Sequence, residues 1–333
     1  MDIHNDRKGA IKKLRLLAYN GKVEVKTFRQ KIDEAYSSVF LPNGVECSEY
    51  KYGNIDCDIL SPEIYASNRV MLYIHGGSYV GGSRLAYRNF CSSIASKTFA
   101  RVVVPEYRLA PASPFPSANE DIQNVFKSLF TEEQIACSLH SSRDSAPVMP
   151  ELIIAADGSA ASIACALIFN LRERYRKCIK KVILFSPWLD LSPNSRLLSP
   201  KKIADEVMSG EVLRKSSQIY TYESNTANPY VSPLKAALHL LENFPEVYIQ
   251  MGKKEILLDD AVEFSKKLEK AGCKCTLDVW DNMMFMFQMA HEYLPESHKA
   301  LDKIGKIVTQ ENDTVFERVE NQPKLESSLR SEA

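Results

Sequence analysis

Five short apolar runs, separated by stretches with helical character, constrain the fold of this chain more than any other feature. The runs cover residues 69–74, 101–104, 152–156, 181–185 and 247–251. Helical patterns cover residues 87–98, 160–174 and 260–270. Continuous apolar strands that alternate with helices are typical of a mostly parallel sheet covered on both faces. We therefore expect an α/β fold.

Composition narrows the class of protein further. The chain has 333 residues, of which 45% are hydrophobic and 25% charged, enough apolar material for one large core. Its 42 basic and 42 acidic side chains balance, which argues against a nucleic-acid partner. No apolar stretch approaches the roughly 18 residues of a membrane span, and the first residues show no secretory signal. We expect a cytoplasmic protein.

The eight cysteines show no CxxC spacing, and several lie in apolar runs. Buried, reduced thiols are therefore the expected state. We expect Cys273 and Cys275 on one strand, where alternation points their side chains to opposite faces and argues against a shared metal ion. The sequence predicts neither a metal nor a cofactor.

Three segments differ from the alternating pattern. Residues 1–45 are charged and compatible with helix, and they precede the first strand signals. Residues 138–150 are rich in Ser, Asp and Pro, which predicts a surface loop. Residues 309–333 are polar with little to bury, which predicts a disordered tail. The main domain would then cover residues 46–308.

A glycine-rich turn, HGGSYVGGS, begins at His75 directly after the first strong strand. Glycines let backbone N–H groups face a cleft without obstruction from side chains. A plain turn or a nucleotide-binding loop are the alternatives, but the segment lacks both GxGxxG and the Gly-Lys-Ser/Thr ending of phosphate loops. Turns of this kind supply oxyanion-hole donors in lipases and esterases.

Further motifs follow the turn in a fixed order. They are PEYRLAP from residue 105, FPSA from 115, SPWLDLS from 186, VSPL from 231 and LLDD from 257. With the glycine-rich turn, this set resembles the hormone-sensitive-lipase-like esterases of the α/β-hydrolase class over residues 50–305. The resemblance implies an α/β-hydrolase fold with helices on both faces of the sheet. It also implies an N-terminal helical cap, formed here by residues 1–45 together with 204–223.

The resemblance also implies a nucleophile elbow of the form Gly-Asp-Ser-Ala-Gly-Gly after the third apolar run. This chain has Ala-Asp-Gly-Ser-Ala-Ala there, so Asp157 matches the family aspartate and Gly158 takes the nucleophile position. A glycine has no side chain with which to attack a carbonyl carbon. A slip of one residue would place Ser159 at the elbow, but Asp157 would then crowd a position that is normally small. In the unshifted register the backbone N–H of Ser159 joins those of Gly76 and Gly77 in the oxyanion hole.

The resemblance also implies two further members of a catalytic triad, an acid and a histidine. This chain has a match for the acid and none for the histidine. Glu255 matches the family's acid, although a surface carboxylate is the alternative interpretation of any one glutamate. Phe285 takes the place of the histidine, and a phenyl ring cannot carry a proton. The apolar run around it, MMFMFQM from residue 283, would make this side of a pocket apolar or simply pack in the core. Of the six histidines, His291 is nearest to this position in the sequence, and we expect it on the surface of the following helix.

Three hypotheses follow. The first is a non-catalytic hydrolase relative whose pocket binds a small apolar or ester-like molecule. The second is a carboxylic ester hydrolase, active or residual, that uses Ser159. The third is an interaction protein in which the hydrolase site is being lost. The tail at residues 309–333 would then contact a partner. The sequence leaves homodimer formation open.

Overall fold

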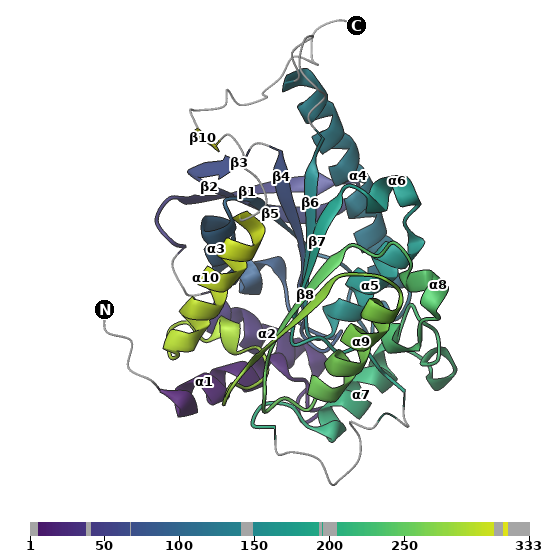
Figure 1. Cartoon of the computed structure of the whole chain (residues 1–333). Helices are drawn as coiled ribbons and strands as arrows, with labels where there is room; N and C mark the ends of the chain where they lie inside the picture. The colour runs from purple at the N-terminus through teal and green to yellow at the C-terminus, as the bar shows by residue number, and fades with distance from the viewer. Residues whose placement is uncertain are drawn as a thin grey trace, which may run out of the picture.

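In the part of the chain that the computed structural model describes, eight strands form one sheet (Figure 1). The described residues are 6–37, 41–66, 68–140, 149–192, 195, 205–309 and 316–318. The strand order is β1-β2-β5-β4-β6-β7-β8-β9. The strands are β1 (Val45–Tyr52), β2 (Ile55–Pro62), β4 (Arg69–Ile74), β5 (Arg101–Pro105), β6 (Glu151–Asp157), β7 (Ile179–Phe185), β8 (Glu246–Gly252) and β9 (Cys275–Trp280).

The sheet is mostly parallel. β2 pairs antiparallel with β1 and with β5, and every other neighbouring pair in this sheet is parallel. Each of the five predicted apolar runs lies within a strand, from β4 to β8. The expected fold class is therefore confirmed.

Helices cover both faces of the sheet (Figure 1). On one face α3 (Arg84–Thr98) packs against α10 (Pro295–Thr309), and on the other lie α4 (Ser117–His140), α5 (Ala160–Asn170) and α9 (Leu258–Lys270). Three further helices are α6 (Glu173–Arg176), α7 (Gly210–Tyr220) and α8 (Leu238–Leu241). The 3-10 turns are η1 (Arg15–Leu17), η3 (Glu223–Asn225), η4 (Pro233–Lys235) and η5 (Phe287–Met289). None of the helices in the described residues is both long and apolar enough to cross a bilayer.

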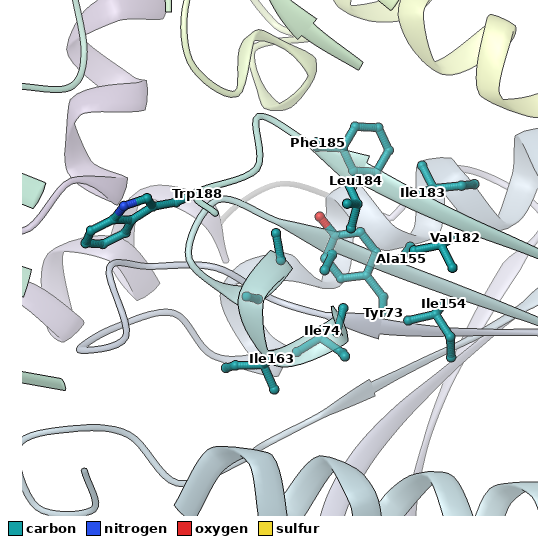
Figure 2. Packing of buried hydrophobic residues seen from close by; sticks show 14 of the residues in the cluster. Tyr73, Ile74, Ile154, Ala155, Ile163, Val182, Ile183, Leu184, Phe185 and Trp188 are labelled. Carbon is teal, nitrogen blue, oxygen red and sulfur yellow. The ribbon is translucent and has the colours of Figure 1, made fainter. Parts of the chain in front are cut away.

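The core explains why these strands are apolar throughout. Every residue of β4 and β6 is buried, because helices cover both faces and neither side-chain orientation reaches water. Figure 2 shows Ile154 of β6 beside Val182 of β7 on one face of the sheet, while Ile183 of β7 points to the other face. Trp188 stands apart from these side chains, beyond the end of β7. The strands therefore form a rigid base for the loops at their carboxyl ends.

The N-terminal helices α1 (Arg7–Leu14) and α2 (Val25–Tyr36) lie at the carboxyl ends of the parallel strands (Figure 1). α2 buries Phe28, Ile32 and Tyr36, which share one helix face at a spacing of four residues. This face packs on the glycine-rich turn, since a Cβ built on Gly81 would lie 2.5 Å from Cε1 of Phe28.

The structure departs from the sequence expectations at three places. Cys273 precedes β9, so it does not share a strand with Cys275. The predicted loop at residues 138–150 begins too early, because α4 continues to His140, and residues 141–148 lie outside the described part. Within the predicted tail, β10 (Phe316–Arg318) pairs antiparallel with β3 (Ile64–Ala66). Residues 310–315 and 319–333 lie outside the described residues, so disorder there stays a prediction.

Candidate active site

A tight turn joins the end of β6 to the start of α5. Gly158 in this turn has φ 48°, a left-handed conformation that residues with side chains seldom adopt. Its N–H donates to the carbonyl of Phe185 at 3.0 Å, and its carbonyl accepts from the N–H of Trp188 at 2.9 Å. Ser159, the N-cap residue of α5, has φ −65°. The strained residue of the strand-to-helix turn is thus Gly158.

The ring of Phe285 lies against Gly158. A Cβ built on Gly158 would be 3.1 Å from Cζ and 3.6 Å from Cε2 of that ring. Phe285 is only 3% exposed, and the methionines on either side of it, Met284 and Met286, are fully buried. The ring would therefore make a tight contact with any side chain at position 158.

Glu255 follows β8 and is buried. Its Oε1 accepts hydrogen bonds from the N–H of Gly252 and from the hydroxyl of Ser186, the latter at 2.9 Å. Its Oε2 is buried and has no hydrogen-bond partner among the described residues. Burial raises the pKa of this carboxyl well above its usual value, outweighing both hydrogen bonds.

Ser186 connects the acid to the loop that carries Phe285. Its hydroxyl donates to Glu255 and accepts from the backbone N–H of Met286 at 3.0 Å. Its own backbone is in the left-handed region, with φ 45°. Ser186 lies in the SPWLDLS motif, but the motif alone does not indicate this bridging role, because both partners are far away in the sequence.

The glycine-rich turn after β4 departs from the prediction at one residue. The N–H of Gly76 donates to Oδ1 of Asp157 at 2.8 Å, so this donor is already used. Within the described part of the chain, the N–H groups of Gly77 and Ser159 have no hydrogen-bond partner. Gly77 has φ 119°, and a Cβ there would collide with the carbonyl of Gly81. These two donors remain candidates for an oxyanion hole.

The hydroxyl of Ser159 lies close to the same turn. Its Oγ accepts a hydrogen bond from the N–H of Tyr79 at 3.1 Å, and the residue is only 4% exposed. The ring of Tyr79 stacks on Tyr220 of α7, with centroids 3.8 Å apart and an angle of 11° between the planes. The Tyr79 hydroxyl is in turn 2.8 Å from that of Ser162. The Ser159 hydroxyl is therefore buried and already bonded to the backbone of the glycine-rich turn.

Asp157 is a buried carboxylate that holds the glycine-rich turn in place. It accepts hydrogen bonds from the hydroxyls of Tyr73 and Tyr87, at 2.9 and 2.8 Å, besides the bond from Gly76. Burial raises the pKa of Asp157 to about 6, although all three donors act in the opposite direction. Its role in this site is to fix the backbone of the turn to β6.

His75, the first residue of the turn, is fully buried and stacks on Tyr107 with centroids 4.4 Å apart. Burial lowers the pKa of His75 to about 4, so the imidazole is neutral at physiological pH. Its Nδ1 lies 3.0 Å from the carbonyl oxygen of Gly76. The ring packs the turn against the core, and its hydrogen-bond contact is to the turn's own backbone and not to Glu255.

None of the remaining histidines whose side chains the structure describes supplies the missing base. His291 lies in a partly buried turn before α10, not on the helix surface as predicted, and the Nε2 of His298 contacts its carbonyl oxygen at 2.9 Å. No hydrogen bond of a described imidazole reaches Glu255 or Ser159. His4 lies outside the described residues, and so does the side chain of His140. The described chain also holds no group of three or more side chains arranged to bind a metal ion.

The N-terminal helices are bonded to the glycine-rich turn. The guanidinium of Arg29 in α2 donates to the carbonyl oxygens of Val80 and Ala110, at 2.7 and 3.1 Å. The hydroxyl of Ser78 accepts from the N–H of Tyr19 at 3.1 Å, and it donates to the carbonyl of Leu17. Residues distant in sequence are therefore hydrogen-bonded to the turn, and they lie in the segment, residues 1–45, that the resemblance implies as a cap.

Comparison with known proteins is consistent with this geometry. A family model described as the alpha/beta hydrolase fold matches residues 71–289. An esterase of Acinetobacter venetianus is 31% identical over 246 residues, which is 73% of this chain and 76% of that protein. An acetyl-hydrolase of Streptomyces hygroscopicus is 27% identical over 287 residues, 86% of this chain and 89% of that protein.

Solved structures show the same likeness. The crystal structure of an esterase from the bacterial hormone-sensitive lipase family matches with a TM-score of 0.78 at 25% identity, covering 91% of this chain and 97% of that one. The order of the motifs, the sheet and the matched family model all point to one assignment. This chain belongs to the α/β-hydrolase family, in its hormone-sensitive-lipase branch.

Proposed function

We propose that this chain is a non-catalytic member of its family, which binds a small molecule and does not cleave it. The observation that carries the proposal is the contact between Gly158 and Phe285. An attacking oxygen and a proton carrier are both needed for ester cleavage by a hydrolase triad. The residues at these two positions are a glycine and a phenylalanine, and the phenyl ring would lie 3.1 Å from a Cβ at position 158.

The state of Glu255 supports the same proposal. In a working triad the acid accepts a hydrogen bond from the imidazole and stabilises the cation that forms there. Here the free oxygen of the carboxyl has no donor among the described residues, and burial favours its neutral form. The carboxyl is thus suited to packing and not to balancing a positive charge.

The N-terminal helices fit the proposal as a cap over the site. Arg29 and Tyr19 bond this segment to the glycine-rich turn, and Tyr220 of α7 stacks over the same turn. We infer that residues 1–45 form the cap and that α7 contributes to it. A ligand held under such a cap would be shielded from water.

A second candidate is a carboxylic ester hydrolase that uses Ser159. The names of the relatives, an esterase and an acetyl-hydrolase, favour it, and the Ser159 hydroxyl lies beside the glycine-rich turn. Two observations weigh against it. Ser159 has ordinary helical backbone angles, and no described imidazole is bonded to its hydroxyl. Without a base, the hydroxyl is a weak nucleophile.

A fluorophosphonate probe separates the two candidates. The non-catalytic proposal predicts no covalent adduct on the full-length protein. Ser159→Ala tests the serine in question, and Ser162→Ala, one helical turn further on and equally buried, is the matched control. An adduct that mass spectrometry places on Ser159, and that Ser159→Ala alone abolishes, would establish the hydrolase instead.

A further inference from the structure

A cavity of about 80 Å³ has a lining that includes neither Gly158 nor Phe285. It lies between the loop that follows β7 and the segment formed by α7 and η3. Its walls include Trp188, Leu191, Leu213, Ser217, Thr221 and Thr226. All six are buried, so the walls are fixed by packing.

The cavity is connected to the elbow through one residue. The backbone N–H of Trp188 donates to the carbonyl of Gly158, while its indole lines the cavity. The indole N–H donates to the carbonyl of Asp190 at 2.8 Å, and the ring centroid lies 5.5 Å from that of Tyr79. An occupant of the cavity would therefore contact the indole face and not the former triad positions.

The charges around the cavity favour an uncharged occupant. Asp190, the buried acid of the lining, already pairs with Lys235 at 2.9 Å and accepts from the N–H of Ser192. The other charged lining residues, Arg214 and Glu223, are exposed to solvent and opposite in sign. A charged ligand would lose its hydration without gaining a buried counter-charge, which is costly.

The hydroxyl groups in the wall favour a ligand that donates a hydrogen bond. Ser217 donates to the carbonyl of Leu191 at 3.0 Å, and Thr226 donates to the carbonyl of Glu223 at 2.7 Å. Because each hydroxyl has one proton, both oxygens retain only acceptor capacity. A third wall hydroxyl, that of Thr221, accepts from the side-chain amide of Asn225 at 3.0 Å and keeps its own proton to donate. An alcohol O–H, which both donates and accepts, can therefore bond to any of the three groups, whereas an ester, whose oxygens only accept, can bond to Thr221 alone.

We infer that this cavity binds a small uncharged alcohol or phenol, with its apolar part against Trp188 and its O–H directed to Ser217 or Thr226. The inference rests on the proposed non-catalytic function and names the ligand class for it. The cavity is about half the size of one of roughly 150 Å³ that holds benzene, so part of the ligand would extend toward the exposed rim. Such a ligand binds with a Kd on the order of 1 mM.

Phenol and toluene, which have the same number of non-hydrogen atoms, test the inference on the full-length protein. Trp188 fluorescence is measured in a Trp280→Phe background, because these are the two tryptophans of the chain. Phenol should bind about threefold to tenfold more tightly than toluene, the difference of one hydrogen bond. Equal affinities, or no binding of phenol, would overturn the inference.

Variants localise the binding. Leu213→Phe should fill the cavity and abolish phenol binding, while Leu238→Phe, at an exposed residue outside the lining, should leave it unchanged. Thr226→Val keeps the shape of the cavity wall and should reduce the preference for phenol over toluene. This second variant keeps the inference testable if Leu213→Phe impairs folding. Phenol binding that survives Leu213→Phe, or a preference for phenol that survives both Thr226→Val and Ser217→Ala, would contradict the assignment.

The assignment of the cavity and the non-catalytic proposal can be refuted independently of each other. Labelling of Ser159 by a fluorophosphonate would refute the non-catalytic proposal and leave a measured phenol site intact. Absence of both labelling and phenol binding would refute only the assignment of the cavity.

Discussion

Phe285 crowds position 158, since a Cβ there would lie 3.1 Å from the Cζ of the ring. The two departures from the family triad are therefore coupled in space, although 127 positions separate them in the sequence. Restoring only the serine would force the ring to move, and replacing only the ring would leave an empty space beside the glycine.

A double-mutant cycle tests this coupling. Gly158→Ser should cost about 2 kcal/mol of unfolding free energy, because a side chain is strained at φ 48° and meets the ring. In a Phe285→Leu background, which removes the contacting ring atoms, the cost should fall by about 0.5–1 kcal/mol. Urea unfolding measures all four proteins. Met284→Leu is the matched background, and the same cost in both backgrounds would show that the ring does not obstruct position 158.

The raised pKa of Glu255 predicts how the stability of the folded protein depends on pH. The folded protein raises the pKa of this carboxyl above its unfolded value, so the folded state holds a proton that the unfolded state releases. The contribution of Glu255 to stability is thus complete below the unfolded pKa and is lost as pH rises toward the folded pKa. Glu255→Gln cannot ionise, and it keeps an acceptor for Gly252 and Ser186.

We therefore expect Glu255→Gln to be more stable than the unmodified protein by about 1 kcal/mol at pH 8, with a smaller difference at pH 5. Urea unfolding at both pH values measures this difference. Glu242→Gln, at an exposed residue, is the control and should show no such trend. A Glu255→Gln protein that loses stability at pH 8 would mean that the carboxylate charge has a partner.

Arg29 is expected to hold the glycine-rich turn under the N-terminal helices. Arg29→Ala removes donors to the carbonyls of Val80 and Ala110, which should cost about 1–3 kcal/mol of unfolding free energy. Hydrogen exchange should also become faster at the backbone amides of Val80 and Gly81. Lys26→Ala, on the exposed side of the same helix, should change neither quantity. Unchanged exchange in Arg29→Ala would show that apolar packing alone holds the turn.

Much of the fold could be predicted because it depends on local patterns. The apolar runs of β4 to β8 are buried on both faces, so each one is visible as an uninterrupted hydrophobic segment. The order of motifs also indicated which residues to compare at the elbow. The expected strand at Cys273 failed because a turn with Gly272 at φ 80° delays the start of β9.

The parts that could not be predicted depend on contacts between distant segments. The donor of Gly76 is taken by Asp157 of another strand, and Ser186 joins two loops that the sequence separates. The stacking of Tyr79 on Tyr220 likewise brings together the glycine-rich turn and α7. Such contacts depend on how the loops pack at the carboxyl end of the sheet, which no single segment encodes.

Hydrolysis of p-nitrophenyl acetate by the unmodified protein and by the Gly158→Ser/Phe285→His double variant tests the central claim most directly. Losing a triad nucleophile or base costs about 10⁶-fold in turnover, so even a partial repair should raise kcat/KM at least about 100-fold. The restored imidazole would also give the unpartnered oxygen of Glu255 a donor. We expect the unmodified protein to match its Ser159→Ala variant and the double variant to exceed both. Turnover by the unmodified protein that Ser159→Ala abolishes would contradict the account.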